Sequence, residues 1–94
     1  MTIQQQDNGK KGAFYIEDDG KRLAEMTYVW AGDKVFIVDH TEVDGSLEGK
    51  GVGKQLVKHA VEFAREKELK IIPLCPFTKG VIDKTPAYQD VLNT

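Results

Sequence analysis

Apolar and polar residues alternate with a period of two along the first half of the chain. Between residues 22 and 30 the alternate apolar positions are Ala24, Met26, Tyr28 and Trp30. This spacing places those side chains on one face of an extended chain. Apolar runs rich in aromatic or β-branched residues also span residues 13–17 and 34–43. The pattern therefore predicts three strands in succession.

Turn sequences separate the three runs. Asp18-Asp19-Gly20 lies between the first two, and Ala31-Gly32-Asp33 lies between the second and third. An Asp-Gly pair between strands is a strong hairpin signal, so we expect an antiparallel meander with short loops. Residues 1–11 are polar, include three consecutive glutamines and show no apolar pattern. We expect them to form a loose N-terminal tail.

A helical period follows the third predicted strand. Apolar residues three or four positions apart are Val52, Leu56, Val57, Ala60, Val61, Phe63 and Ala64. They predict a helix of about four turns whose apolar face covers the sheet. Residues 70–75 form a short apolar run in which Pro73 limits pairing to an edge or a bulge. A helical crossover makes this strand parallel to the strand at 34–43. A short helix over 77–83 and a terminal piece over 88–92 that packs back complete the prediction.

These elements predict an α/β (α+β) fold. The predicted order is an antiparallel three-strand meander, a helix, a strand parallel to the third, and a short C-terminal helix, in one domain covering residues 1–94. With 40% hydrophobic and 30% charged residues, the composition is that of an ordinary globular domain.

Charge, cysteine content and hydropathy limit the possible partners and the cellular compartment of the protein. The net charge of −2 argues against a nucleic-acid partner, which usually meets a basic excess. No apolar run approaches the ~20 residues of a membrane span, and the N-terminus lacks a secretory signal. The lone Cys75 excludes an internal disulfide and fits a reducing compartment. We expect a cytoplasmic protein with no membrane partner, as a monomer or weak dimer.

A glycine-rich turn precedes the predicted helix. Its sequence is Glu48-Gly49-Lys50-Gly51-Val52-Gly53-Lys54. Amides and the positive dipole end of a helix that starts in such a turn favour a phosphate or pyrophosphate. The lysines strengthen this interpretation, because the first turn of a helix usually prefers acids. The alternative is a glycine-rich loop entering a solvated helix, with lysines that serve solubility alone.

Two well-known phosphate motifs do not fit the turn. The dinucleotide fingerprint G-x-G-x-x-G fails because Lys54 occupies its last position. The P-loop G-x-x-x-x-G-K-[ST] fails because Glu48 and Gln55 occupy its first and last positions. We find no metal-ligating motif either.

The turn in its setting resembles the acetyl-coenzyme A site of the GNAT superfamily of N-acetyltransferases. The superfamily pattern Gln/Arg-x-x-Gly-x-Gly/Ala falls on residues 48–53, with Glu48 replacing the usual Gln or Arg. His40-Thr41-Glu42-Val43 before the turn and Cys75 after the next strand are similar to the small single-domain branch labelled YjdJ-like or NATD-like. The resemblance covers roughly residues 13–92.

The resemblance implies that the chain binds acetyl-CoA. The turn amides would hold the pyrophosphate, Lys50 and Lys54 are candidates for phosphate contacts, and the pantetheine arm would lie between the end of the 34–43 strand and the strand that ends at Cys75. The implied cofactor-binding residues are Thr41, Val43, Glu48, Gly49, Lys50, Gly51, Val52, Gly53, Lys54 and Pro76.

Three residues are candidates for the chemistry of acetyl transfer. Alternation predicts that His40 and Glu42 share a strand face with Phe36 and Val38, and either is a candidate base; the His pKa of about 6.5 suits this role. Cys75 is a candidate to accept the acetyl group or to protonate the leaving thiolate. The alternatives are a structural His40, a Glu42 that pairs with a lysine, and a Cys75 that is only a small buried apolar residue.

The resemblance implies an N-acetyltransferase that acts on an amine. The acceptor is a small amine or a protein lysine or N-terminus, and the short chain predicts a shallow, open acceptor surface. The alternative is a CoA or acyl-CoA binding module with little or no transferase activity. A third reading is an interaction domain with a degenerate site.

Overall fold

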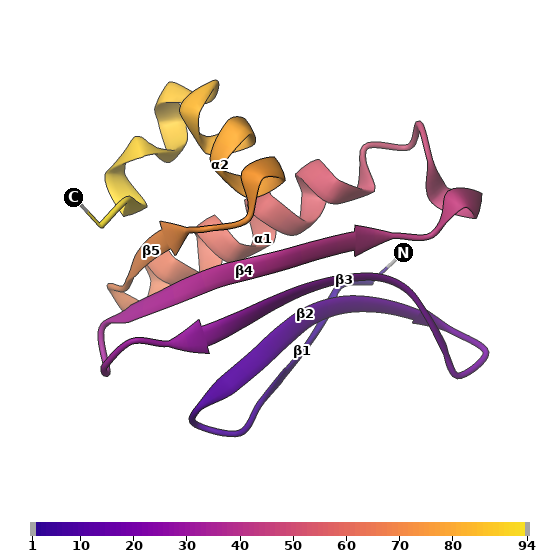
Figure 1. Cartoon of the computed structure of the whole chain (residues 1–94), viewed down its shortest axis with the longest axis horizontal. Helices are drawn as coiled ribbons and strands as arrows, with labels where there is room; N and C mark the ends of the chain where they lie inside the picture. Colours follow the sequence, from indigo (N-terminus) through magenta and orange to yellow (C-terminus); the bar gives the residue numbers. More distant parts are fainter. Residues whose placement is uncertain (1, 94) are drawn as a thin grey trace.

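Five strands form one sheet in the computed structural model, which describes residues 2–93. The strands are β1 (Gln4–Asp7), β2 (Lys11–Asp18), β3 (Lys21–Trp30), β4 (Val35–Val43) and β5 (Lys70–Pro73). Their order across the sheet follows their order along the chain (Figure 1). β1 to β4 pair antiparallel, and β5 pairs parallel to β4. The mixed fold with a parallel fifth strand is therefore confirmed.

The prediction of a loose tail over residues 1–11 is wrong. Gln4–Asp7 forms the edge strand β1, with Gln4 opposite Tyr15 and Asp7 opposite Gly12. Polar contacts fasten it to the sheet: the Asp7 carboxylate accepts from the Tyr28 hydroxyl at 2.6 Å and from the Trp30 indole at 2.9 Å. β1 carries no apolar alternation because these polar contacts, together with main-chain pairing, hold it in place.

The hairpin predicted at Asp18-Asp19-Gly20 is confirmed. Asp19 has φ 51° and Gly20 has φ 75°, the left-handed pair that a two-residue hairpin turn requires. The sharp turn brings β2 directly against β3, with Phe14 opposite Met26.

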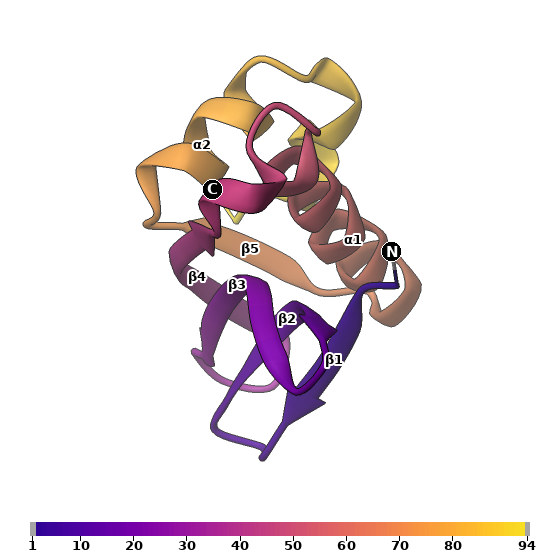
Figure 2. The same cartoon turned by 90° about the vertical axis from the view of Figure 1, so that its right-hand side faces the viewer.

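All helices lie on one face of the sheet (Figures 1 and 2). α1 (Val52–Lys67) buries the predicted apolar stripe against Phe14, Met26, Tyr28 and Phe36 of the sheet, except that Phe63 stays half-buried. Along the chain, η1 (Gly45–Leu47) precedes α1, and α2 (Pro76–Asp83) and η2 (Pro86–Val91) follow β5. Val91 is buried and Leu92 bridges Ile71 of β5, so the terminal piece packs back as predicted. No helix between residues 2 and 93 is long and apolar enough to cross a membrane. We call the face without helices the open face.

A β-bulge at Asp39 interrupts the alternation in β4. Tyr28 lies opposite Val38 but Thr27 lies opposite His40, which leaves Asp39 as the extra residue. Because side chains change face at every residue, one extra residue reverses the pattern beyond it. Thr41 now shares the helix-covered face with its partner Met26, whereas His40 shares the open face with Thr27. The prediction that His40 and Glu42 lie on the face of Phe36 and Val38 is therefore wrong.

β4 and β5 separate at the bulge. Their pairing ends at Val38 and Pro73, and the Val38 carbonyl then accepts from the backbone amides of both Leu74 and Cys75 at 3.0 Å. β5 is an edge strand, as Pro73 requires. The second half of β4 is consequently left without a strand neighbour on this side, directly below the start of α2 (Figure 1).

Candidate functional site

The glycine turn leads into α1 through left-handed backbone. Gly49 has φ 78°, and Gly51, which caps the helix, has φ 69°. L side chains rarely adopt such angles, so these two positions favour glycine. No side chain caps the helix. Within residues 2–93, no protein acceptor is hydrogen-bonded to the amides of Gly51, Val52, Gly53 and Lys54.

The charges around these amides suit an anion. The first turn of α1 carries no acidic residue, and the exposed Lys50 and Lys54 flank the helix start. The positive end of the helix dipole points into the same space. Glu48 is exposed as well and caps η1 through its backbone amide rather than its side chain. Free amides, a first helical turn without acidic residues and two lysines together suit a phosphate, and we call residues 48–54 the phosphate turn.

Gly53 serves a different purpose from the first two glycines. A Cβ on Gly53 would lie 2.7 Å from Cζ of Phe77, closer than such atoms approach. The Phe77 ring therefore packs directly over the first turn of α1, where only glycine leaves room for it. The contact joins the start of α2 to the phosphate turn.

Cys75 lies at the junction of β5 and α2, where it caps α2. Its side chain is buried, and its Sγ donates to Oγ1 of Thr41 at 3.4 Å. Thr78 Oγ1 lies 3.4 Å from the same Thr41 oxygen. Burial raises the pKa of the Cys75 thiol, but once the thiol is ionised the Thr41 hydroxyl can turn and donate to the sulfur, and it lowers the pKa together with the Thr78 and Phe77 groups at the helix start. The net pKa of Cys75 lies below the ordinary cysteine value, which favours its thiolate form.

The structure brings some of the predicted site residues together and separates others. Thr41 and Val43 lie on the helix-covered face, with Thr41 in contact with Cys75. His40 and Glu42 lie on the open face, opposite Thr27 and Glu25. The bulge thus places the candidate bases and the candidate thiol on opposite sides of β4.

Comparison with known proteins identifies the family. A profile of GCN5-related N-acetyl-transferases matches residues 13–91. Protein NATD1 of Gallus gallus is 28% identical over 88 residues, 93% of this chain and 80% of that protein. The solution structure of a GCN5-like protein from Staphylococcus aureus is 40% identical with a TM-score of 0.72, covering 96% of this chain and 87% of that one. An aminoglycoside N-acetyltransferase in complex with CoA has the same fold at 13% identity, with a TM-score of 0.62 over 99% of this chain and 95% of that one.

The chain belongs to the GCN5-related N-acetyltransferase family. The prediction from the sequence of a small GNAT-type acetyltransferase is therefore confirmed. The cofactor of this family is acetyl-CoA. The free amides at the start of α1 and the cations beside them fit its pyrophosphate.

Three residues near the site were not predicted from the sequence. Phe77, Thr78 and Lys84 all belong to α2 or its end. The helix was predicted over 77–83, but its amphipathic pattern shows only that Thr78 and Ile82 share a face. That Phe77 lies over Gly53 follows from how α2 is placed on α1, which no local pattern encodes.

Proposed function

We propose that this protein transfers the acetyl group of acetyl-CoA to an amine. The observation that carries the proposal is the contact of the Cys75 thiol with Thr41, at the point where β4 and β5 separate and next to the phosphate turn. Acetyl-CoA supplies an acetyl group on a thioester, which a nucleophile can attack at its carbonyl carbon. We propose a reducing, cytoplasmic setting, because the lone Cys75 must remain a free thiol.

The proposed roles of the chain's own groups follow their positions. The amides of Gly51 to Lys54 bind the pyrophosphate, and the unpaired second half of β4 orients the pantetheine arm along Thr41 and Val43. Cys75 lies where the arm ends and serves the departing thiolate, as the acid that protonates it or as a transient acceptor of the acetyl group. In the second case the Cys75 sulfur bonds the carbonyl carbon, the bond to the CoA sulfur breaks, and CoA leaves as a thiol after taking up a proton.

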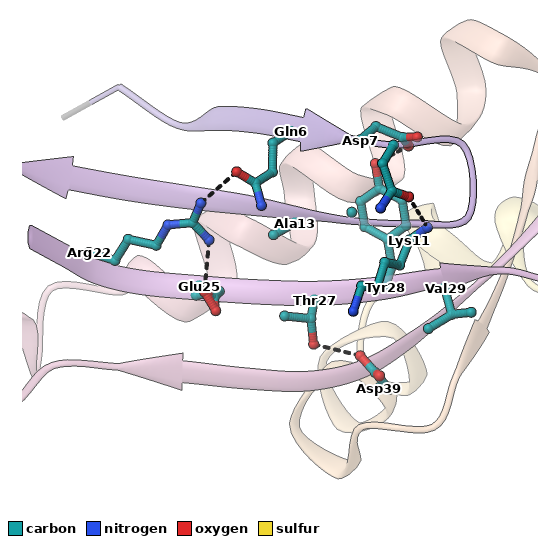
Figure 3. Close-up of a pocket in the computed structure, with 12 residues that line it drawn as sticks. Gln6, Asp7, Lys11, Ala13, Arg22, Glu25, Thr27, Tyr28, Val29 and Asp39 are labelled. Carbon is teal, nitrogen blue, oxygen red and sulfur yellow. Dashed lines mark hydrogen bonds and ion pairs between the residues drawn. The ribbon is translucent and has the colours of Figure 1, made fainter.

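We propose that the amine approaches from the open face. A cavity of about 460 Å³ lies there on β1 to β4, with Asp7, Glu25 and Asp39 among its lining residues (Figure 3). Lys11 and Arg22 line the cavity as well, and Arg22 pairs with Glu25 at 2.9 Å, so Asp7 and Asp39 are the carboxylates left to attract a cationic amine. We propose that the nitrogen reaches across the sheet where β4 and β5 separate. His40, on this face, then takes the proton that the amine must lose, and Glu42 is the second candidate.

The acceptor class remains a proposal in two forms, a small amine or a protein lysine or N-terminus. No helix covers the open face (Figure 2), which suits either. We propose that the protein works as a monomer or weak dimer, because one chain contains every group named above.

The test is turnover with matched variants. The protein is incubated with acetyl-CoA and a panel of small amines, lysine peptides and free N-terminal peptides, and acetylated product is measured by mass spectrometry. We expect turnover by the wild type and a loss of about 10²-fold or more in the H40Q variant with unchanged acetyl-CoA affinity. Intact-protein mass spectrometry without acceptor shows whether Cys75 gains one acetyl group, with C75A as the control.

A CoA-binding module without transferase activity is the second candidate. The separation of His40 and Glu42 from Cys75 across the sheet favours it, because no candidate base shares a face with the thiol. Tight binding of acetyl-CoA by the wild type with no product from any amine would establish this function instead of acetyl transfer.

A further inference from the structure

Thr78 is the one polar residue between positions 2 and 93 that is fully buried. It lies in the first turn of α2, which Cys75 caps. A buried hydroxyl costs free energy unless it is hydrogen-bonded. The choice of threonine is therefore informative, because valine would fill the same space without that cost.

In the described chain, the Thr78 hydroxyl makes a long-range contact in place of the local bond that a helical threonine commonly makes. Thr85, just after α2, makes the local bond: its Oγ1 donates to the carbonyl of Val81 at 2.7 Å. Oγ1 of Thr78 instead lies 3.4 Å from Oγ1 of Thr41, which is 37 residues earlier and belongs to β4. The Thr78 hydroxyl thus connects two elements rather than two turns of one helix.

Thr78, Thr41 and Cys75 form one chain of polar groups. The thiol of Cys75 donates to Oγ1 of Thr41 at 3.4 Å, and either hydroxyl of the threonine pair can be the donor. A hydroxyl has one hydrogen to donate and two lone pairs that accept. While Cys75 is a thiol, the hydrogen bonds can run from Cys75 to Thr41 and on to Thr78. Once Cys75 is a thiolate, they can run in the opposite direction, and Thr41 then donates to the sulfur.

Charged side chains on the elements around Cys75 face elsewhere or have partners of their own. They are Asp39, His40 and Glu42 on the open face of β4, Lys79 and Asp83 paired with each other on α2, and the exposed Lys54 on α1 and Lys70 on β5. Burial raises the pKa of Cys75, and the groups that lower it are uncharged: the hydroxyls of Thr41 and Thr78 and the backbone of Thr78 and Phe77.

We propose that Thr78 is a positioning residue that acts on Cys75 through Thr41. It keeps the Thr41 hydroxyl directed at the sulfur, and it supplies the acceptor or the donor that Thr41 needs in each state of the thiol. The inference rests on the proposed role of Cys75 in acetyl transfer. In both versions of that role the S–H bond of Cys75 breaks and its proton ends on the departing CoA sulfur. The hydrogen bonds of the chain reverse at that step.

The rate of iodoacetamide alkylation of Cys75 as a function of pH tests the inference, in the full chain without cofactor. T78V removes the hydroxyl and keeps the shape of the side chain, so its profile should shift to higher pH, with alkylation at neutral pH roughly fivefold slower. T78S, which keeps the hydroxyl, should stay within about twofold of the wild type. T85V is the matched control, because it removes a nearby threonine hydroxyl whose partner is a carbonyl, and its profile should not shift.

A double variant distinguishes action through Thr41 from a general loosening of α2. In a T41V background the hydroxyl on which Thr78 acts is already gone, so adding T78V should shift the profile much less than T78V does alone. Circular dichroism checks the fold of each variant. T78A takes the place of T78V in the same comparisons with T78S and T41V if T78V does not fold.

The outcomes separate this inference from the proposed function. An unshifted T78V profile, a T78S profile that matches T78V, a shift in T85V, or fully additive shifts in the double variant would each overturn the inference and leave acetyl transfer untouched. The expected shifts in a protein that acetylates no amine would uphold the action of Thr78 on the thiol and overturn the transferase.

Discussion

The Sγ of Cys75 lies 3.4 Å from Oγ1 of Thr41, and this contact links the start of α2 to the part of β4 beyond the bulge. Thr41 reaches Cys75 because β4 bulges at Asp39: regular alternation through Asp39 would have turned Thr41 to the open face. The electronic state of the thiol thus depends on the register of a strand that pairs with β3. Backbone geometry and thiol chemistry are coupled at this point.

Replacing Thr41 by valine should raise the pKa of Cys75. Valine keeps the shape of the side chain but removes the hydroxyl that stabilises the thiolate. At neutral pH the thiolate fraction should fall, because the pKa moves up towards the ordinary cysteine value. The rate of iodoacetamide alkylation as a function of pH measures this: the T41V profile should shift to higher pH. Thr27→Val, on the open face of β3, is the control, and an unshifted T41V profile would contradict the proposed origin of the lowered pKa.

Two glycine-to-alanine substitutions in helices should have different effects. Gly80 lies inside α2, and a Cβ there meets nothing within 4 Å, so G80A should raise the free energy of unfolding by about 0.5–1 kcal/mol. In G53A the same propensity gain is offset, because the new Cβ displaces the Phe77 ring. We expect G53A to be about 1 kcal/mol less stable than G80A in urea denaturation. Equal stabilisation by both would show that the ring does not need the space.

Gly51→Glu should abolish acetyl-CoA binding. The substitution places a negative side chain at the helix cap, where the pyrophosphate is expected, and at a φ of 69° that L residues rarely adopt. Calorimetric titration of acetyl-CoA should give a strong signal for the wild type and none for this variant. Gly45→Glu serves as the control, because Gly45 precedes the turn at η1 and has open space around it. Retained binding by G51E would mean that the turn does not hold the phosphates.

Deleting Asp39 should remove the bulge without exchanging the faces of the residues that follow it. His40 would then follow Val38 directly and stay on the open face, and Thr41 would stay on the helix-covered face beside Cys75. We expect acetyl-CoA affinity and the Cys75 alkylation profile to stay close to wild type, as in Asp39→Ala, which keeps the bulge residue but loses the hydrogen bond from Thr27 at 2.6 Å. An alkylation profile shifted like that of T41V would show that the deletion had turned Thr41 to the open face.

Acid should weaken the attachment of β1 through Asp7. Burial raises the pKa of this carboxyl, but hydrogen bonds from Tyr28, the Gly9 amide and Trp30 outweigh it, so the folded-state pKa lies below the ordinary value of an aspartate. A lowered pKa means that the contribution is fully present above about pH 4 and is lost as pH falls through the folded-state pKa. D7N should remove this part of the acid-induced loss, measured as the urea midpoint between pH 5 and pH 2. Asp33→Asn, in the turn before β4, should leave the acid limb of the curve unchanged.

The parts of the fold that follow from short-range patterns could be predicted from the sequence. The Asp19-Gly20 turn, the apolar stripe of α1 and the glycine turn each depend on residues close together in the chain. β1 could not be predicted, because its anchors Tyr28 and Trp30 are more than a dozen residues away and its own side chains are polar.

In the candidate site, too, features set by neighbouring residues could be predicted and features set by distant residues could not. The phosphate turn and Cys75 were identified from local motifs, whereas the bulge at Asp39 was not, since a single extra residue leaves no mark on composition and is defined only by pairing with β3. The prediction from regular alternation therefore assigned His40 and Glu42 to the wrong face of the sheet. Phe77 and Lys84 depend on how α2 is docked, which is a long-range property.

The agreement between strand order and chain order has a consequence for folding kinetics. β1 to β4 can pair through short loops, which close quickly, whereas β5 must wait for the whole of α1 to cross the sheet. We therefore expect the antiparallel strands to assemble early and β5 with α2 to dock late. The contact between Phe77 and Gly53 and the position of the Cys75 thiol both depend on that late step. A ligand bound beside them should therefore act chiefly by slowing unfolding rather than by speeding folding.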